Sequence, residues 1–187
     1  MKSNPSGDQR LEHQCQMPVT LDTLLKLGVF YQNINPNDYS SNEGFLKFRK
    51  VHNYRFEDII EISPSTLENY EEKIKSFYDE HIHTQDEVRY ILEGSGFFDI
   101  RDLRNSWIRI EVTKGDLISL PAGMFHRFTT DQKNYIKALR LFKDDPEWTP
   151  HLRSELKPNN ETVQRYRRKY AGCQGSYMLN RFIHSIW

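Results

Sequence analysis

The sequence predicts a mainly β fold, an antiparallel barrel or sandwich that follows a largely helical N-terminal half. From residue 81 onward, short apolar runs alternate with polar turn signals at fairly even intervals, which is typical of many short strands. Before that point, apolar residues recur at the spacing of amphipathic helices. A closed antiparallel barrel can hold a small ligand in its interior, so the predicted fold leaves room for an internal site.

Length and charge limit the class of protein. A chain of 187 residues suits one domain with a sizeable core. We expect residues 1–18 to be a loose lead-in, residues 19–150 to form the single domain, and residues 151–187 to be a helical or irregular C-terminal extension. Lysine plus arginine equals aspartate plus glutamate at 26 each, which speaks against nucleic acid as a partner.

The ends of the chain predict a soluble intracellular protein. No run approaches the roughly 18 apolar residues of a membrane span, so membrane insertion is not expected. The first residues lack the apolar core of a signal peptide. Cys15 and Cys173 lie far apart in polar ends, which predicts two free thiols in a reducing compartment.

The N-terminal half predicts helices. In TLDTLLKLGV, Thr20 is suited to cap a short helix with Leu21, Leu24 and Leu25 on one side, and Gly28 is suited to end it. Further helices are expected in NEGFLKFRKVHNY, which has a cationic outer face, in YRFEDIIEI, and in LENYEEKIKSFYDE. The apolar positions that support these three are, in chain order, Phe45, Leu46 and Phe48; Phe56, Ile59 and Ile60; Tyr70, Ile74, Phe77 and Tyr78.

The second half predicts strands in the runs VRYILE, FFDIRD, WIRIEV, LISL, FHRFT and YIKALRLF. The break Gly94-Ser95-Gly96 separates the first two runs. In WIRIEV, Ile108, Ile110 and Val112 are expected to form the apolar face. After residue 142 the strand pattern ends, and ETVQRYRRKYAG predicts a basic helix.

A cluster of metal-ligand residue types lies at the junction of the two halves. His81, His83 and Glu87 fall within seven residues, and the two histidines share a face if the segment is a strand. His126 supplies a fourth ligand at the start of a later strand, after a Pro-x-Gly turn. Three imidazoles and one carboxylate suit a divalent first-row metal such as iron or nickel. A closed structural zinc site is disfavoured because both cysteines are distant.

The spacings HxHx3E-x6-G and Gx5PxGx2H resemble the paired motifs of the cupin superfamily. The phrases EEKIKSFYDEHIHTQDEVRYILEGSGFFDIRD, WIRIEVTKGDLISLPAGMFHRFT and NYIKALRLFKDDPEW resemble the eukaryotic acireductone dioxygenases, and this likeness extends over residues 21–148. The resemblance implies a cupin double-stranded β-helix barrel. It also implies one Fe(2+) or Ni(2+) per chain, held by His81, His83, Glu87 and His126.

The resemblance further implies a reaction of methionine salvage. The substrate would be the acireductone 1,2-dihydroxy-3-keto-5-methylthiopentene, which is oxidised by O2. The iron form would yield 4-methylthio-2-oxobutanoate and formate, and the nickel form 3-methylthiopropionate, formate and CO. We expect a cytoplasmic monomer whose partners are these small molecules; a nuclear location and protein partners stay open.

Two arginines are candidates for stabilising the charge of the substrate. A dication with one carboxylate leaves part of the charge of an enediolate dianion uncompensated, so a further cation is needed. Arg89 follows Glu87 by two residues on the same predicted strand face. Arg140 lies in the last predicted strand. The alternative is that both are ordinary surface arginines.

Three aromatic residues are candidates for the substrate pocket. Phe128 follows His126 by two residues and so should line the same cavity. Phe77 and Trp148 match aromatic positions that border the pocket in the family that the chain resembles. Packing in the core is an equally good reading of all three.

Two other functions remain open at this stage. One is a binding or scaffold protein that keeps the cupin fold and its metal without turnover. The other is a cupin enzyme for a different substrate, such as a quercetin-type dioxygenase or a metal isomerase. Oxygen consumption with an acireductone distinguishes both from the leading reading.

Overall fold

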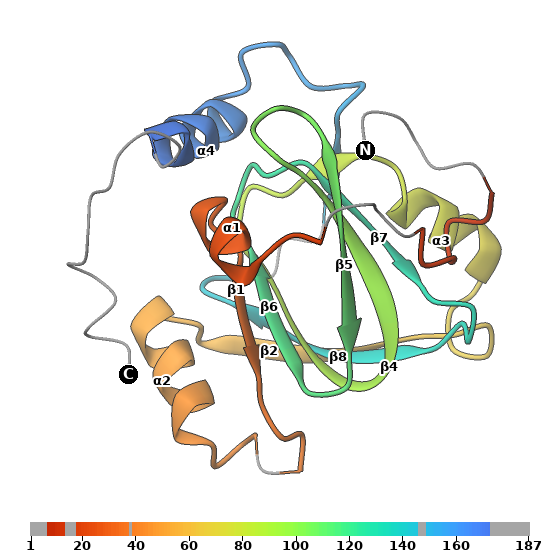
Figure 1. Ribbon diagram of the computed structural model, residues 1–187. Helices are drawn as coiled ribbons and strands as arrows, with labels where there is room; N and C mark the ends of the chain where they lie inside the picture. Colours follow the sequence, from red (N-terminus) through yellow and green to blue (C-terminus); the bar gives the residue numbers. More distant parts are fainter. Residues whose placement is uncertain (1–6, 14–17, 38, 146–148, 173–187) are drawn as a thin grey trace.

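The chain folds into a barrel of antiparallel strands with helices on its outside (Figure 1). In this computed structural model the described residues are 7–13, 18–37, 39–145 and 149–172. Their elements are, in chain order, α1 (Leu21–Lys26), β1 (Phe30–Asn33), α2 (Glu43–His52), β2 (Phe56–Ile62), α3 (Tyr70–Phe77), β3 (His81–Ile82), β4 (Glu87–Arg101), β5 (Trp107–Thr113), β6 (Asp116–Leu120), β7 (His126–Thr130), β8 (Ile136–Phe142), β9 (His151–Leu152) and α4 (Glu161–Ala171). The predicted mainly β class is confirmed. Among the helices of these residues, none has the length and apolar character needed to cross a membrane.

Strand β4 belongs to two sheets and joins them into the barrel. One sheet has the order β1-β6-β4-β8-β2 and the other β5-β4-β7-β3-β9. The pairing with β8 is irregular between Ile91 and Glu93 and ends at Gly94, which has φ +75°; pairing with the second sheet begins at the next residues. The prediction that Gly94-Ser95-Gly96 ends a strand was therefore wrong. Glycine at positive φ lets this strand change direction and pair with new neighbours, so the strand continues.

The segment YRFEDIIEI forms strand β2, so the predicted helix is also wrong. The strand pairs with β8 along its whole length, from Phe56 opposite Phe142 to Ile62 opposite Ile136. Ile60 and Ile62 line an internal cavity, whereas Ile59 is 54% exposed. Helical spacing placed Ile59 and Ile60 on one face, but pairing with β8 separates them onto opposite faces.

The other predicted helices are confirmed. Thr20 caps α1 by accepting a hydrogen bond from the Thr23 amide at 3.2 Å. Of the three leucines expected on one side of α1, Leu24 is buried and Leu21 and Leu25 are exposed. Helices α2, α3 and α4 occupy the expected segments, and each buries apolar side chains against the barrel.

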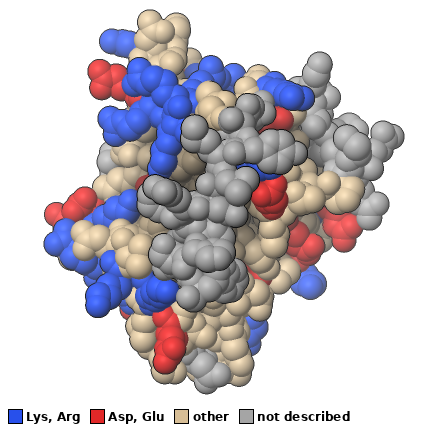
Figure 2. Space-filling view, turned by 60° about the vertical axis from the view of Figure 1, so that its left-hand side comes forward, with Lys and Arg blue, Asp and Glu red and all other residues tan. Residues whose placement is uncertain are grey.

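Basic side chains gather on the face that carries α2 and α4 (Figure 2). The cationic outer face of α2 and the basic character of α4 were both predicted from the sequence. The residues concerned are Lys47, Arg49 and Lys50 in α2 and Arg165, Arg167, Arg168 and Lys169 in α4. Arg49 forms an ion pair with Glu57, so part of this charge is compensated.

The remaining strand predictions hold, with β6, β7 and β8 at LISL, FHRFT and YIKALRLF. In β5, Ile110 and Val112 belong to the core and Ile108 packs against it, as expected. Three predictions, for Cys15, Cys173 and the chain after residue 172, lie outside the described residues.

The alternation of side chains along β4 separates the core from the cavity. Val88 and Tyr90 are fully buried in a cluster with Phe45 and Phe48 of α2. The neighbouring positions Glu87, Arg89 and Ile91 line the cavity. One strand thus carries a hydrophobic face that packs under α2 and a polar face that serves a site.

Replacing Gly94 by alanine should destabilise the barrel by about 2 kcal/mol, because its φ is +75° and an added Cβ would lie 2.2 Å from the Tyr135 carbonyl oxygen. Urea unfolding measures this loss. The Gly172→Ala protein is the control, since a Cβ at Gly172 meets nothing within 4 Å. Equal midpoints for the Gly94→Ala and unmodified proteins would contradict the strain argument.

Candidate metal centre

Four side chains with metal-ligand atoms meet inside the barrel. β3 supplies His81, the turn after it His83, β4 begins with Glu87, and β7 begins with His126. The pairing of β3 with β7 places His81 directly opposite His126. Each of the four residues offers one ligand atom, and these four atoms all lie within 4.8 Å of one another. The structure thus brings together the four residues singled out by the sequence motifs.

The buried polar atoms of this group are suited to bind a cation. Glu87 Oε2 and His126 Nε2 lie 2.7 Å apart. Neither atom has a hydrogen bond within the described part of the chain, although both are buried. Buried polar atoms are costly unless a partner satisfies them. A metal ion between the two would satisfy both, so these residues fit a metal.

Backbone carbonyl groups orient two of the imidazoles. His81 Nδ1 lies 2.6 Å from the Asp79 carbonyl oxygen, and His126 Nδ1 lies 2.8 Å from that of Met124. Because a carbonyl group only accepts hydrogen bonds, Nδ1 is the protonated nitrogen in each ring. The Nε2 lone pair of each ring is then available as a metal ligand.

Burial and charge favour the protonation states that a metal needs. Burial, with a contribution from His126, lowers the pKa of His81 to about 3, and burial also lowers the pKa of His83. Burial acts in the opposite direction on Glu87, but Arg89 and His126 outweigh it and hold the pKa of that carboxyl well below its usual range. Two neutral imidazoles and a carboxylate are therefore ready to bind a cation.

The site opens into a cavity of about 550 Å³. Phe77 and Phe128 both line it, as expected from the sequence. Trp148 lies outside the described residues. The other apolar lining residues include Ile60, Ile62, Ile91, Phe98, Ile136, Ala138 and Phe142. The cavity therefore combines a polar metal-ligand group with a largely apolar wall.

Both candidate arginines line this cavity. Arg89 Nη2 lies 2.9 Å from Glu87 Oε1. Arg140 donates two hydrogen bonds to Asp58, at 2.7 and 2.8 Å. Asp58 was missed because its segment was read as a helix. The alternation of apolar and polar residues in Ile60-Glu61-Ile62 was the signal that could have revealed a strand. Asp58, two residues before Ile60, then lies on the inner face.

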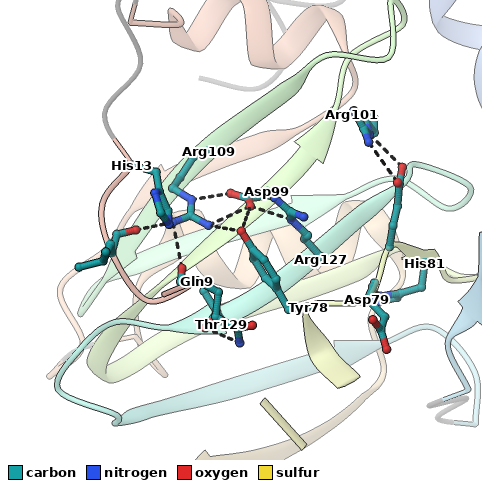
Figure 3. Close-up of polar contacts among 12 residues, drawn as sticks. Gln9, His13, Tyr78, Asp79, His81, Asp99, Arg101, Arg109, Arg127 and Thr129 are labelled. Atoms are coloured by element: carbon teal, nitrogen blue, oxygen red, sulfur yellow. Dashed lines mark hydrogen bonds and ion pairs between the residues drawn. The ribbon is translucent and has the colours of Figure 1, made fainter. Parts of the chain in front are cut away.

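A second buried charge cluster lies on β4, β5 and β7 (Figure 3). Asp99 accepts hydrogen bonds from Arg109 Nε at 2.6 Å, Arg127 Nε at 2.8 Å and the Tyr78 hydroxyl at 3.0 Å. Arg109 also donates to the Gln9 carbonyl oxygen at 3.1 Å, which ties the N-terminal residues to the barrel. Sequence reasoning did not single out Asp99, because its partners are distant in the chain.

The fold and the site define the chain as a cupin-type barrel with a group of three histidines and one glutamate that could hold a metal. The ARD/ARD′ family model matches residues 1–150. The chain is 53% identical over 148 residues to the acireductone dioxygenase of Xenopus laevis, covering 78% of this chain and 83% of that protein. It is 51% identical over 150 residues to the acireductone dioxygenase of Rattus norvegicus, and this match covers 79% of this chain and 84% of that protein. The chain belongs to the ARD/ARD′ family.

A solved structure agrees with this assignment. The acireductone dioxygenase from Bacillus anthracis, with a cadmium ion in its active centre, superimposes with a TM-score of 0.61 at 30% identity. The match covers 69% of this chain and 86% of the bacterial one. The predicted cupin fold and the family resemblance are thus confirmed.

Proposed function

We propose that this protein is an acireductone dioxygenase of methionine salvage, the activity for which its relatives are named. The observation that carries the proposal is the meeting of His81, His83, Glu87 and His126 within 4.8 Å, beside a cavity of about 550 Å³. Its reactants would be the acireductone and O2. The cytoplasm is the proposed place of the reaction.

The proposed metal is Fe(2+) or Ni(2+), one per chain, held by these four residues. When bound, it would supply a Lewis-acid centre for the adjacent oxygen atoms of the enediolate. The Asp79 and Met124 carbonyl groups keep His81 and His126 in the required tautomer and orientation.

Arg89 and Arg140 would stabilise the charge of the substrate. A dication with one ligand carboxylate carries one net positive charge, so an enediolate dianion leaves one negative charge to be met. Arg89 lies against Glu87 at 2.9 Å, and both side chains are largely shielded from solvent, which places a permanent cation at the metal ligands. Electrostatic interactions are stronger between partly buried groups than in bulk water.

The apolar wall would bind the methylthio tail and exclude water. Phe77 lies at the end of α3 and Phe128 in β7, so the two rings reach the cavity from different elements. The ring of Phe128 packs against that of Phe98 at a tilt, with their centroids 5.0 Å apart, which holds Phe128 in place. Trp148 is proposed to border the same pocket.

Loading metal-free protein separately with iron and nickel tests the proposal. We expect the iron form to yield 4-methylthio-2-oxobutanoate and formate, and the nickel form 3-methylthiopropionate, formate and CO, because the metal determines how the substrate chelates. Product analysis by chromatography and CO detection measures this outcome.

Identical products from both forms would contradict control by the metal. A protein that binds metal but consumes no O2 with acireductone would instead be a non-catalytic binding protein. Consumption of O2 with a flavonol, without turnover of acireductone, would indicate a different cupin enzyme.

A further inference from the structure

A row of four charged side chains crosses β2, β8 and β4. Asp58 of β2 lies directly opposite Arg140 of β8, and Arg140 lies directly opposite Arg89 of β4. Glu87 precedes Arg89 by two residues on the same face of β4. The order of charges along the row is therefore negative, positive, positive, negative.

The two central arginines require compensation. Like charges directly opposite each other on neighbouring strands destabilise a sheet, and the Arg89 side chain is only 18% exposed. Asp58 binds the Nε and Nη2 atoms of Arg140 through both carboxylate oxygens. This bidentate geometry fixes the guanidinium plane as well as balancing its charge. The Asp58 side chain is 38% exposed and that of Arg140 15% exposed, so the pair connects the cavity wall to solvent.

The row has no net charge, because Asp58 balances Arg140 and Glu87 balances Arg89. A metal dication adds two positive charges, which match the two negative charges of an enediolate. The proposed keto acid and formate carry one negative charge each, so the products have the same total charge as the substrate. Replacing Asp58 by a neutral residue would make the surroundings of every anion in the cavity more positive by one charge.

We propose that Asp58 is a positioning residue that orients Arg140 and limits the positive charge of the cavity, so that neither the dianionic substrate nor the two product anions are held by an additional positive charge. The inference rests on the proposed function for the identity of the anions. The row of charges itself is a property of the fold. Asp58 touches Arg140 rather than acting on the reacting atoms.

The test measures anion binding without turnover. Oxalate, a planar dianion with adjacent oxygen atoms, is titrated into air-free nickel-loaded protein by isothermal titration calorimetry, with neutral imidazole as the comparison ligand. We expect Asp58→Asn to bind oxalate about tenfold more tightly, because one net positive charge more acts on a dianion in a partly buried site, with imidazole affinity unchanged. Metal content is measured after each titration, because oxalate also chelates free metal.

Matched variants separate charge from structure. Asp144→Asn removes the same charge from an exposed ion pair with Arg55 and should leave oxalate affinity within about twofold. Asp58→Glu keeps the negative charge, so its oxalate affinity should stay near that of the unmodified protein. Adding Arg140→Gln to Asp58→Asn should abolish the gain, since loss of the Arg140 cation restores the total charge of the row.

Steady-state kinetics with acireductone supply an independent readout. Asp58→Asn should lower KM and kcat together, because substrate binds and products leave more slowly. Unchanged oxalate affinity in folded Asp58→Asn, or an equal gain for imidazole, overturns the inference even when acireductone is turned over. Absence of turnover in the unmodified protein, together with the tenfold oxalate gain, defeats the proposed function and leaves the role of Asp58 standing.

Discussion

The His126→Ala protein is expected to bind its metal at least about 100-fold more weakly than the unmodified protein, because even loss of a group that only orients a ligand costs 10–100-fold. His126 is 2% exposed, and its Nε2 atom lies 2.7 Å from Glu87 Oε2. Removing the ring leaves three ligands and a space at the centre of the site. Metal analysis of the purified protein measures the loss directly.

Loss of the metal should also lower the rate of acireductone oxidation by about 10³-fold, since a bound metal contributes several kcal/mol of transition-state stabilisation. His13→Ala is the matched control, because His13 lies on the N-terminal segment, where its Nε2 contacts the Asp8 carbonyl oxygen. That variant should keep its metal and its rate. A folded His126→Ala protein with normal metal content would show that His126 is not a ligand.

The Asp99→Asn protein is expected to lose about 3–5 kcal/mol of unfolding free energy, the usual cost of removing one partner from a buried ion pair. The side chains of Asp99, Arg109 and Arg127 are 3%, 7% and 3% exposed. An amide in place of the carboxylate leaves two buried guanidinium groups without their counter-charge. Thermal unfolding should shift by roughly 6–20 °C in a protein of this size.

The same cluster predicts a dependence on pH. Burial alone would raise the pKa of Asp99, but the hydrogen bonds and charges of Arg109 and Arg127 outweigh it, so the pKa in the folded state is lowered. The stabilisation is then fully present above the unfolded pKa of about 3.9 and is lost as the pH falls through the lower folded value. The difference between the unmodified and Asp99→Asn proteins should be constant near neutral pH and shrink below about pH 4.

Asp144→Asn serves as the control for this prediction, because the ion pair of Asp144 with Arg55 is exposed on both sides. Its removal should change the unfolding free energy by less than about 1 kcal/mol. Equal stability of the Asp99→Asn and Asp144→Asn proteins would show that the buried cluster contributes no more than a surface pair.

Much of the candidate site was predictable because its residues lie close together in sequence or in recognisable spacings. His81 and His83 lie two residues apart, and Glu87 follows after a short turn, so the three fall within seven residues and are close in space for local reasons. Arg89 was predicted from strand alternation, because it follows Glu87 by two residues and so shares its face. The basic helix α4 and the capped helix α1 were likewise readable, since capping and amphipathic spacing act within a few residues.

The two wrong predictions of secondary structure have one physical cause: strand pairing depends on partners that are distant in the chain. YRFEDIIEI satisfies helical spacing, but pairing with β8 makes it a strand. Gly94 looks like a turn residue, yet neighbours in two sheets keep β4 continuous through it. No local pattern identifies these pairing partners.

The sequence by itself determined the metal-ligand types, their spacing, the alternating β half and the neutral overall charge. Only the tertiary structure decided that Asp58 binds Arg140 and that Asp99 joins Arg109 to Arg127. These ion pairs join strands separated by up to 82 residues in the chain. Their energies depend on burial and on cross-strand register, and both arise only when the barrel closes.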